Sequence, residues 1–292
     1  MRKEVERKMK KKIQLEDDEY INPKDNLIWC KKCNTPRQIR KIFGSRTLTP
    51  KIKCKCQAEE ARRQAALNEK AERKKRILQM KQAGLGWKDL WKMTYEADDG
   101  HNPNLMARIK NYTVSLEDSP RLGVLFWGPP GRGKTYLAAC IINDLLEKEV
   151  PAGMFSFRQL ITEISGMSLP NRTEYLDDLF RKKALCLDDF SLKCYLKYSE
   201  NVIMDIIDRI DRCGFPVILT TNYTMSELEH PKTELEEYAF RIILNRTVPI
   251  KVDGLNMKEI KNQEHYQQVQ RQCMGKMYEP EPGSSDQQAH LN

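Results

Sequence analysis

The sequence predicts an α/β fold, with a parallel five-stranded sheet preceded by a small cysteine-bearing module and a linker helix. Between about Trp87 and Asp253, short apolar runs alternate with amphipathic stretches, which is typical of strands joined by crossover helices. Before this region, residues 58–83 lack Pro and Gly and are rich in Ala, Glu, Lys and Arg, as in one long solvated helix. Nearer the N-terminus, four of the nine cysteines lie between Trp29 and Gln57.

The apolar runs place the individual elements and the domain boundaries. A helix is expected over Thr135–Glu147, between the first two strands. The expected strands are Gly123–Trp127, Gly153–Phe157, Ala184–Leu187, Phe215–Thr220 and Val248–Val252. We expect an N-terminal module at 1–57, a charged linker helix at 58–84, the main domain at 85–262 and a C-terminal extension at 263–292, its last part disordered.

Composition excludes some classes of protein and favours others. The net charge of +9 fits a partner that carries phosphates, although many basic chains bind no nucleic acid. The charged N-terminus lacks the apolar stretch of a secretory signal, and the apolar runs are too short to span a bilayer. We therefore expect a cytoplasmic protein without membrane contact, in which clustered cysteines indicate a metal rather than disulfides.

The stretch Gly128–Tyr136 carries the strongest functional signal. It begins Gly-Pro-Pro-Gly-Arg-Gly-Lys-Thr, which fits G-x-x-x-x-G-K-[ST], between an expected strand and an expected helix. Its glycines let consecutive N–H groups face phosphate oxygens, and the helix adds its positive end. The lysine would contact the β- and γ-phosphates of ATP, and the threonine hydroxyl would ligate Mg²⁺. The residues expected to hold the nucleotide are Gly128, Pro129, Pro130, Gly131, Arg132, Gly133, Lys134, Thr135 and Tyr136.

Two further strand ends carry side chains suited to ATP hydrolysis. The run Leu-Cys-Leu-Asp-Asp ends in Asp188, which would hold Mg²⁺ through water, and Asp189, which would orient the attacking water. The run Val-Ile-Leu-Thr-Thr-Asn ends in Asn222, whose amide could contact the γ-phosphate or the water. Because the carboxyl ends of parallel strands share one edge of a sheet, these groups should meet Lys134 there. Solvated acids and a helix-capping asparagine are the alternative interpretations.

The cysteine cluster has the spacing of a metal site. Cys30 and Cys33 form one close pair, and Cys54 and Cys56 form a second pair further along the chain. Four thiolates make a tetrahedral Zn²⁺ site, and neighbouring lysines would favour the thiolate form. A metal would also explain how so short a module folds. Unpaired surface thiols are the alternative.

Taken together, these motifs resemble a known family. GPPGRGKT, LCLDDF, VILTTN and Tyr238–Arg246 are similar to an AAA+ domain, and Asn111-Tyr-Thr-Val and Ile206-Ile-Asp-Arg to the DnaC/DnaI helicase loaders of bacteria and phages. The resemblance covers about Trp87–Gly254. It implies an AAA+ P-loop NTPase domain without a lid domain, ATP and Mg²⁺ as cofactors, and a setting in the bacterial cytoplasm or a phage-infected host.

The resemblance also implies roles for single residues. Asn222 would be sensor 1, and an arginine after it would complete the ATP site of a neighbouring subunit. Arg241 and Arg246 are both candidates, and about 140° separates them around a helix, so they cannot share one role. The family pattern favours Arg246, with a surface arginine as the alternative. Asp189 stands where many AAA+ ATPases have Glu, and its shorter reach predicts slow hydrolysis by the chain alone. Lys258 stands where the family often has Arg, which leaves that arginine's role open.

The partners are likewise implied by the resemblance. A loader binds a hexameric replicative DNA helicase through its zinc-bearing module, self-associates through its AAA+ domain and delivers the helicase onto single-stranded DNA. Interleaved aromatic and basic side chains favour two segments for the DNA contact, 155–183 and 191–198. The side chains in question are Phe157, Arg158, Tyr175, Arg181, Lys182, Lys183, Lys193, Tyr195, Lys197 and Tyr198. Solvated helix faces with core aromatics are the alternative for any one of them, so the prediction concerns the segments and not single residues.

Two other functions share the same ATP site. A transposase helper ATPase of the IstB type is one, although the cysteine module argues against it. A nucleotide-gated adaptor without significant ATPase activity is the other. The motifs of the ATP site do not distinguish among the three.

Overall fold

The computed structural model describes residues 15–100, 102–116, 122–193 and 199–254, together with Asn256, Glu259, Asn262, Gln263 and Tyr266. The chain divides into two compact units, Met1–Lys75 and Arg76–Asn292. Helix α2 (Lys55–Gly84) contains the boundary between them. It includes the whole of the helix predicted over 58–83 and is slightly longer at both ends. Among the described residues, no helix is both long and apolar enough to cross a membrane.

The N-terminal unit holds two small antiparallel hairpins. Strand β1 (Glu19–Ile21) pairs with β2 (Ile28–Cys30), and β3 (Lys41–Phe43) pairs with β4 (Arg46–Leu48). The buried Arg37 links the unit together, because its two terminal nitrogens bind the Asp18 carboxylate at 2.9 and 2.6 Å. A bidentate pair of this kind fixes both partners in one geometry.

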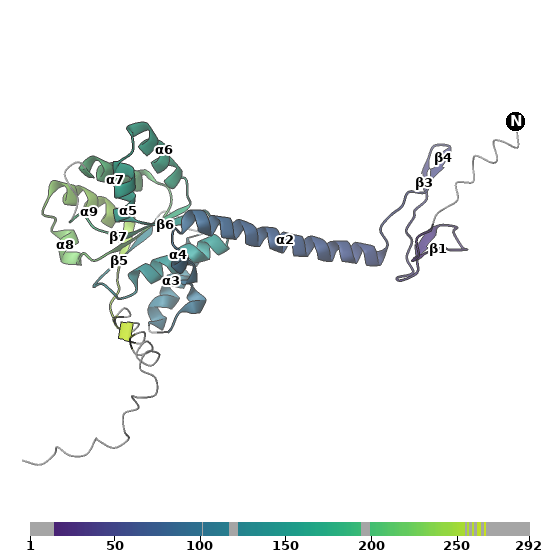
Figure 1. Cartoon of the computed structure of the whole chain (residues 1–292), viewed down its shortest axis with the longest axis horizontal. Coiled ribbons are helices and arrows are strands. Elements are labelled where there is room, and N and C mark those ends of the chain that lie inside the picture. The colour runs from purple at the N-terminus through teal and green to yellow at the C-terminus, as the bar shows by residue number, and fades with distance from the viewer. Residues whose placement is uncertain are drawn as a thin grey trace, which may run out of the picture. The chain divides into compact units, whose positions relative to one another are not determined.

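The second unit is built around a parallel sheet of five strands (Figure 1). The strands are β5 (Gly123–Trp127), β6 (Ala152–Ser156), β7 (Ala184–Phe190), β8 (Val217–Thr221) and β9 (Thr247–Lys251). Their spatial order is β6-β7-β8-β5-β9, with parallel pairing throughout. The first strand along the chain therefore lies inside the sheet, and the predicted α/β fold class with five parallel strands is confirmed.

Helices cover both faces of this sheet and make two separate cores. The helices are η1 (Lys88–Lys92), η2 (Tyr95–Ala97), α3 (Pro103–Ser115), α4 (Lys134–Glu147), α5 (Phe157–Ser165), α6 (Leu169–Leu179), α7 (Glu200–Arg212), α8 (Met225–Glu229) and α9 (Glu234–Arg246). Side chains of α5 to α9 pack in one core, and those of α3, α4 and the residue after α2 pack in the other. Cys140 and Cys186 are fully buried in these layers, as predicted.

Strand β7 departs from its predicted end. The prediction stopped it at Leu187, whereas the strand continues through both aspartates to Phe190. Its pairing with β8 shifts register between Leu187 and Phe190, and Asp189 has a φ of 56°. Such a bulge re-aims the side chains of a strand without ending it. The two carboxylates thus lie inside a distorted strand rather than in a loop.

Several sequence expectations concern residues that the structure describes only in part. Most of 1–19 and of 263–292 lies outside the described residues, as do Tyr195, Lys197, Tyr198 and Lys258. The expected absence of a lid domain after Gly254 concerns residues 255–292, most of which lie outside the described residues.

Candidate ATP site and cysteine cluster

The P-loop follows β5 and turns into α4 as its sequence predicts. Gly128, Gly131 and Gly133 all have positive φ values, of 136°, 79° and 90°. At Gly128 a Cβ atom would also lie 2.5 Å from the carbonyl oxygen of Val252. Both constraints favour glycine, because L side chains rarely adopt these angles and no space remains for one. The loop therefore holds its N–H groups at the positive end of α4, where phosphates bind.

Lys134 lies in the first turn of α4 and is largely buried, with 8% of its surface exposed. Its ammonium group donates to the carbonyl oxygens of Gly128 and Pro129 at 2.7 and 2.8 Å and to Asn222 Oδ1 at 2.7 Å. Burial lowers the pKa of Lys134, while the charges of Asp189 and Asp188 act in the opposite direction. The predicted meeting of Lys134 with Asn222 at the sheet edge is thus present in the structure.

Asp188 meets the hydroxyl groups of two threonines. Thr135 Oγ1 donates to its carboxylate at 3.0 and 3.3 Å, and Thr220 Oγ1 donates to Oδ1 at 2.6 Å. Burial raises the pKa of Asp188, and these hydrogen bonds act against that effect. A hydroxyl and a carboxylate at this distance are the oxygen ligands that Mg²⁺ takes in P-loop proteins. These oxygen atoms are suitable ligands for the Mg²⁺ that the sequence predicts at Thr135 and Asp188.

Asp189 is held beside Asn222. Its carboxylate accepts a hydrogen bond of 3.1 Å from Asn222 Nδ2, and its own N–H donates to Thr220 Oγ1 at 2.9 Å. Thr220 therefore contacts the side chain of one aspartate and the backbone of the next. We did not expect this role from the sequence, because it arises from the register shift between β7 and β8 rather than from any motif.

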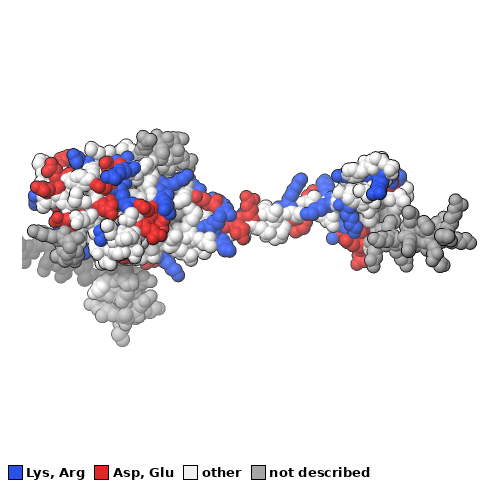
Figure 2. All heavy atoms as spheres, turned by 90° about the horizontal axis from the view of Figure 1, so that it is seen from above, with Lys and Arg blue, Asp and Glu red and all other residues white. Residues whose placement is uncertain are grey.

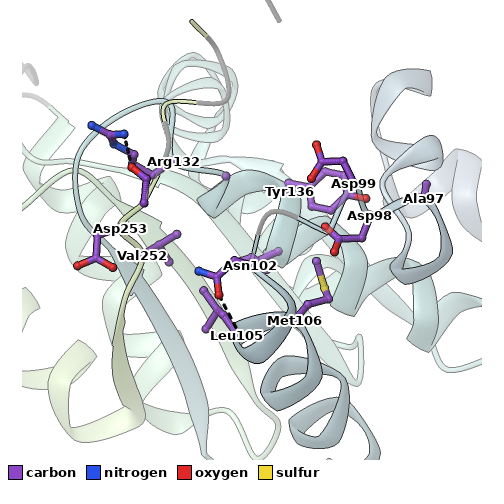
Figure 3. Close-up of a pocket in the computed structure, with 13 residues that line it drawn as sticks. Ala97, Asp98, Asp99, Asn102, Leu105, Met106, Arg132, Tyr136, Val252 and Asp253 are labelled. Carbon is purple, nitrogen blue, oxygen red and sulfur yellow. Dashed lines mark hydrogen bonds between the residues drawn. The ribbon is translucent and has the colours of Figure 1, made fainter. Parts of the chain in front are cut away.

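A pocket of about 130 Å³ opens beside the P-loop, on the side of α3 (Figure 3). In Figure 3 the side chains of Asp98 and Asp99 lie beside Tyr136, and Arg132 lies across the pocket with its guanidinium bonded to the Gly254 carbonyl. The other lining residues are Ala97, Asn102, Leu105, Met106, Gly133, Leu137, Val252 and Asp253. The residues of 97–106 were missed by sequence reasoning, since they belong to no phosphate motif.

A second hollow, of about 430 Å³, lies beside the carboxylates. Thr135, Asp188 and Asp189 form part of its lining. Its remaining walls come from η1, β6, α5 and α6, and include Trp87, Phe155, Gln159, Glu163 and Tyr175. Asp188 and Asp189 are therefore accessible from a side of the domain different from that of the first pocket.

The two candidate arginines differ in their surroundings. Arg246 is half-buried, and its Nη2 donates to the carbonyl oxygens of Cys213 and Phe215 at 2.5 and 3.4 Å. Arg241 is exposed, and its guanidinium lies 5.8 Å from the ring centre of Tyr238. Cys213 and Phe215 precede strand β8, so Arg246 lies at the sheet edge opposite to the P-loop of its own chain. Neither arginine joins the ATP site formed by this chain.

The residues predicted for DNA contact that the structure describes differ in their exposure. Phe157 is fully buried in the core formed by α5 to α9, so its ring is not available to a base, and for this residue the alternative of a core aromatic holds. Lys182 is half-buried with its ammonium 6.0 Å from the ring centre of Phe155, and Lys193 pairs with Glu227 at 2.7 Å. Exposed cations remain at Arg158, Arg181 and Lys183.

The four predicted metal ligands come together in the N-terminal unit. The sulfur atoms of Cys30, Cys33, Cys54 and Cys56 all lie within 4.8 Å of one another. Cys56 Sγ is 3.3 Å from that of Cys54 and 3.6 Å from that of Cys30. A tetrahedral Zn²⁺ with Zn–S bonds of about 2.3 Å sets its sulfurs about 3.8 Å apart. The hydrogen bond with Thr35 lowers the pKa of Cys33 to about 6, which favours the thiolate that a metal requires. The cluster fits Zn²⁺.

Comparison with known proteins bears on the family to which this region is similar. Residues 124–245 match the family described as ATPase family associated with various cellular activities (AAA). The replicative helicase loader DnaI of Bacillus subtilis (strain 168) is 26% identical over 186 residues, which cover 58% of this chain and 60% of the relative. The replicative helicase loader DnaC of Escherichia coli (strain K12) is 26% identical over 128 residues, or 43% of this chain and 52% of the relative. The chain thus spans between about half and three-fifths of these relatives.

Two solved structures are similar to part of the chain. The DnaC helicase loader superposes with a TM-score of 0.49 at 19% identity, over 57% of this chain and 100% of that one. The DnaI structure gives a TM-score of 0.48 at 20% identity, over 59% of this chain and 93% of that one. The resemblance drawn from the motifs is confirmed to this extent: residues 124–245 match the AAA family, and the curated relatives of this part of the chain are DnaI and DnaC helicase loaders.

Proposed function

We propose that this protein is an ATP-dependent loader that binds a hexameric replicative DNA helicase and delivers it onto single-stranded DNA. AAA-family membership supports ATPase activity in general, and the curated relatives are replicative helicase loaders. The observation that supports ATP dependence is the contact of Lys134 with Asn222 and of Thr135 with Asp188 at one edge of the sheet, and the choice of a loader over the alternatives is supported by the curated relatives and the four-cysteine cluster. This arrangement suits a nucleotide whose presence controls a partner.

In this proposal the nucleotide spans the P-loop and the first pocket. Its phosphates lie against the N–H groups of Gly128–Thr135, and Lys134 exchanges its contacts with carbonyl oxygens for contacts with phosphate oxygens. The base and ribose occupy the pocket between Tyr136 and the residues of 97–106, which adjoins Gly133. Thr135 and Asp188 hold the Mg²⁺, which neutralises charge on the phosphates when bound.

Hydrolysis then depends on the pair Asp189 and Asn222. Asp189 accepts a proton from the water that attacks the γ-phosphorus, and the bond between that phosphorus and the ADP oxygen breaks, which yields ADP and phosphate. The hydrogen bond of 3.1 Å between Asn222 and Asp189 orients the carboxylate. Because an aspartate reaches less far than a glutamate, the chain alone turns over more slowly than the roughly ten per second of a typical enzyme.

The second hollow is the proposed place of contact with a neighbouring subunit. It opens beside Thr135, Asp188 and Asp189 and carries carboxylates that suit an incoming cation. We assign this role to Arg246, which lies away from the P-loop of its own chain and must leave the carbonyl oxygens of Cys213 and Phe215 to take it. Self-association through the AAA-family domain therefore completes the site.

The cysteine cluster and the remaining basic surface serve the other partners. We assign the helicase contact to the N-terminal unit, whose fold Zn²⁺ at Cys30, Cys33, Cys54 and Cys56 stabilises. Single-stranded DNA is held by the AAA-family domain, through the segments 155–183 and 191–198. The protein acts in the cytoplasm of a bacterial cell or of a phage-infected host.

A loading assay with the replicative helicase of the same genome tests the proposal. We expect the full chain to bind the hexamer and to increase its transfer to closed circular single-stranded DNA in the presence of Mg·ATP, and Lys134→Ala to bind the helicase without transferring it. Absence of helicase binding, or capture of a transposase instead, would refute the loader role. Normal transfer by both Lys134→Ala and Asp189→Asn would favour the adaptor without significant ATPase activity.

A further inference from the structure

Among the described residues of the cysteine module, the hairpin β3–β4 is exposed along both of its strands. All six residues of its two strands are exposed, with 72% of Ile42, 61% of Phe43 and 53% of Leu48 accessible. A two-stranded hairpin with both faces open has little stability of its own. Apolar side chains at such a position indicate a surface that something else covers.

The foot of the hairpin is firmly held by the rest of the module. The backbone N–H of Ile39 donates to Pro50 at 3.2 Å, and that of Ile52 donates to Arg37 at 2.7 Å. Arg37 in turn binds Asp18, and its Nη2 lies 3.6 Å from Cys30 Sγ. The hairpin therefore lies between the second and third cysteines of the cluster, and backbone hydrogen bonds at its base fix it to the rest of the module.

Cations and apolar residues alternate on one face of the hairpin. Lys41 pairs across the strands with Leu48, and Phe43 pairs with Arg46. Directly opposed residues of an antiparallel pair point to the same side, so these four side chains share one face. Ile42 lies on the other face, opposite a threonine. The aromatic ring is thus bordered by two cations.

The charge of the segment is of one sign. Between residues 38 and 53 there are five Lys or Arg residues and no Asp or Glu. Lys51 is paired with Glu16 and Glu19, at 3.5 and 3.6 Å. Among the residues that the structure describes, no carboxylate lies within ion-pair distance of Lys41 or Arg46. Figure 2 shows Lys and Arg side chains at the surface of this module, with Asp and Glu side chains gathered at one part of it. The charge of the hairpin therefore favours an anionic partner.

The arrangement favours a polynucleotide over an acidic protein. The buried centre of a protein interface is depleted of charged residues, whereas here cations border the exposed ring and the apolar residues are divided between two faces. Cations that hold phosphates beside a ring that stacks on a base are the means by which single strands are bound. The exposed ring also requires an unpaired base, which a duplex does not offer.

We propose that the hairpin β3–β4 is a contact site for single-stranded nucleic acid, in which Lys41 and Arg46 hold backbone phosphates and Phe43 stacks on a base. The site lies outside the AAA-family domain and does not depend on the ATP site. It goes beyond the proposed loader function, because it gives the cysteine module a direct contact with single-stranded nucleic acid.

Fluorescence anisotropy with a labelled oligothymidylate tests the site on the full-length chain. We expect Phe43→Ala to weaken binding about tenfold, since stacking on one base is worth roughly that much. The double variant Lys41→Gln/Arg46→Gln should reduce the slope of log affinity against log salt by about 1.4, or about 0.7 for each lost phosphate contact. Both effects should persist in a Lys134→Ala background, so they can be separated from failure of the loader function.

Matched controls distinguish the site from net charge and from misfolding. Arg63→Gln/Lys70→Gln removes two exposed charges from α2 and should leave the slope nearly unchanged, and Ile42→Ala on the opposite face should leave affinity unchanged. Zinc content must equal that of the wild type in every variant. Wild-type affinity and slope in the hairpin variants would overturn the proposal. So would an equal loss on a duplex of the same length, or variants that bind the strand normally and lose only a helicase partner.

Discussion

Replacement of Thr220 by valine tests whether the threonine of β8 positions both aspartates. The hydroxyl is almost fully buried, donates to Asp188 Oδ1 at 2.6 Å and accepts from the N–H of Asp189 at 2.9 Å. Valine keeps the shape of the side chain and removes both hydrogen bonds. A hydrogen bond to a charged group contributes about 1.5–3 kcal/mol and a neutral one about 0.5–1.5 kcal/mol. We therefore expect the free energy of unfolding to fall by about 2–4 kcal/mol.

The neighbouring Thr221 provides the control. Its hydroxyl is also buried, donates to the Phe190 carbonyl at 2.8 Å and accepts from the N–H of Tyr223 at 3.2 Å. Thr221→Val thus removes two neutral hydrogen bonds, one to β7 and one from the residue pair that follows β8, and should cost about 1–3 kcal/mol. It leaves both aspartates with all their partners, so the two variants share a loss of stability and differ at the site.

ATP hydrolysis at saturating Mg·ATP, corrected for the folded fraction from urea titration, separates the two variants. Thr220→Val should lower kcat about 10- to 100-fold, because Asp189 loses the contact that fixes its backbone and general-base catalysis depends on position. It should also need about tenfold more Mg²⁺ for half-maximal activity, equivalent to about 1.4 kcal/mol. Equal rates and equal Mg²⁺ requirements in the two variants would refute this role of Thr220.

Three further predictions concern other parts of the chain. Zinc content should be about one per chain in the wild type and in Cys213→Ser, and close to zero in Cys54→Ser; metal in Cys54→Ser equal to the wild type would contradict the four-cysteine site. The hydrogen bond from Lys193 lowers the pKa of Glu227 to about 2, below its ordinary value of 4.5, so the stability that the carboxylate adds is fully present above pH 4.5 and is lost as the pH falls towards 2. Urea titrations should show that the deficit of Glu227→Gln at pH 6 shrinks at pH 3, and a deficit independent of pH would exclude the ionised pair as its cause. A mixture of Lys134→Ala with Arg246→Ala should hydrolyse ATP faster than either variant alone, because intact sites then meet intact arginines, and a mixture with Arg241→Ala in place of Arg246→Ala is the comparison; no gain on mixing would argue against Arg246 acting between subunits.

The P-loop and the polar residues at the ends of the strands could be predicted from the sequence. The P-loop requires glycines at fixed spacing, and the structure gives Gly128, Gly131 and Gly133 the positive φ values that explain them. Asp188 and Asn222 were expected at the same edge because parallel strands end there, and that argument needs only the fold class. Arg37 could not be predicted in this way, because no local pattern marks it as the buried partner of Asp18.

Features that depend on register or on distant packing could not be predicted. Thr220 reaches both aspartates only because β7 is bulged between Leu187 and Phe190, and an apolar run does not reveal a bulge. The pocket beside Tyr136 is closed by residues of 97–106, which sequence reasoning had no motif to identify. Phe157 could not be placed for the same reason: an aromatic residue next to basic ones can face the core as well as the solvent, and packing decides which.

Titration calorimetry of the wild-type protein with Mg·ATP tests the central claim most directly. We expect saturable binding that ADP competes for and that weakens when Mg²⁺ is chelated. The affinity should fall by at least about 100-fold in Lys134→Ala while the melting curve stays cooperative. Heat of the same size and affinity in Lys134→Ala, or no binding to the wild type, would show that the loop after β5 does not hold a triphosphate.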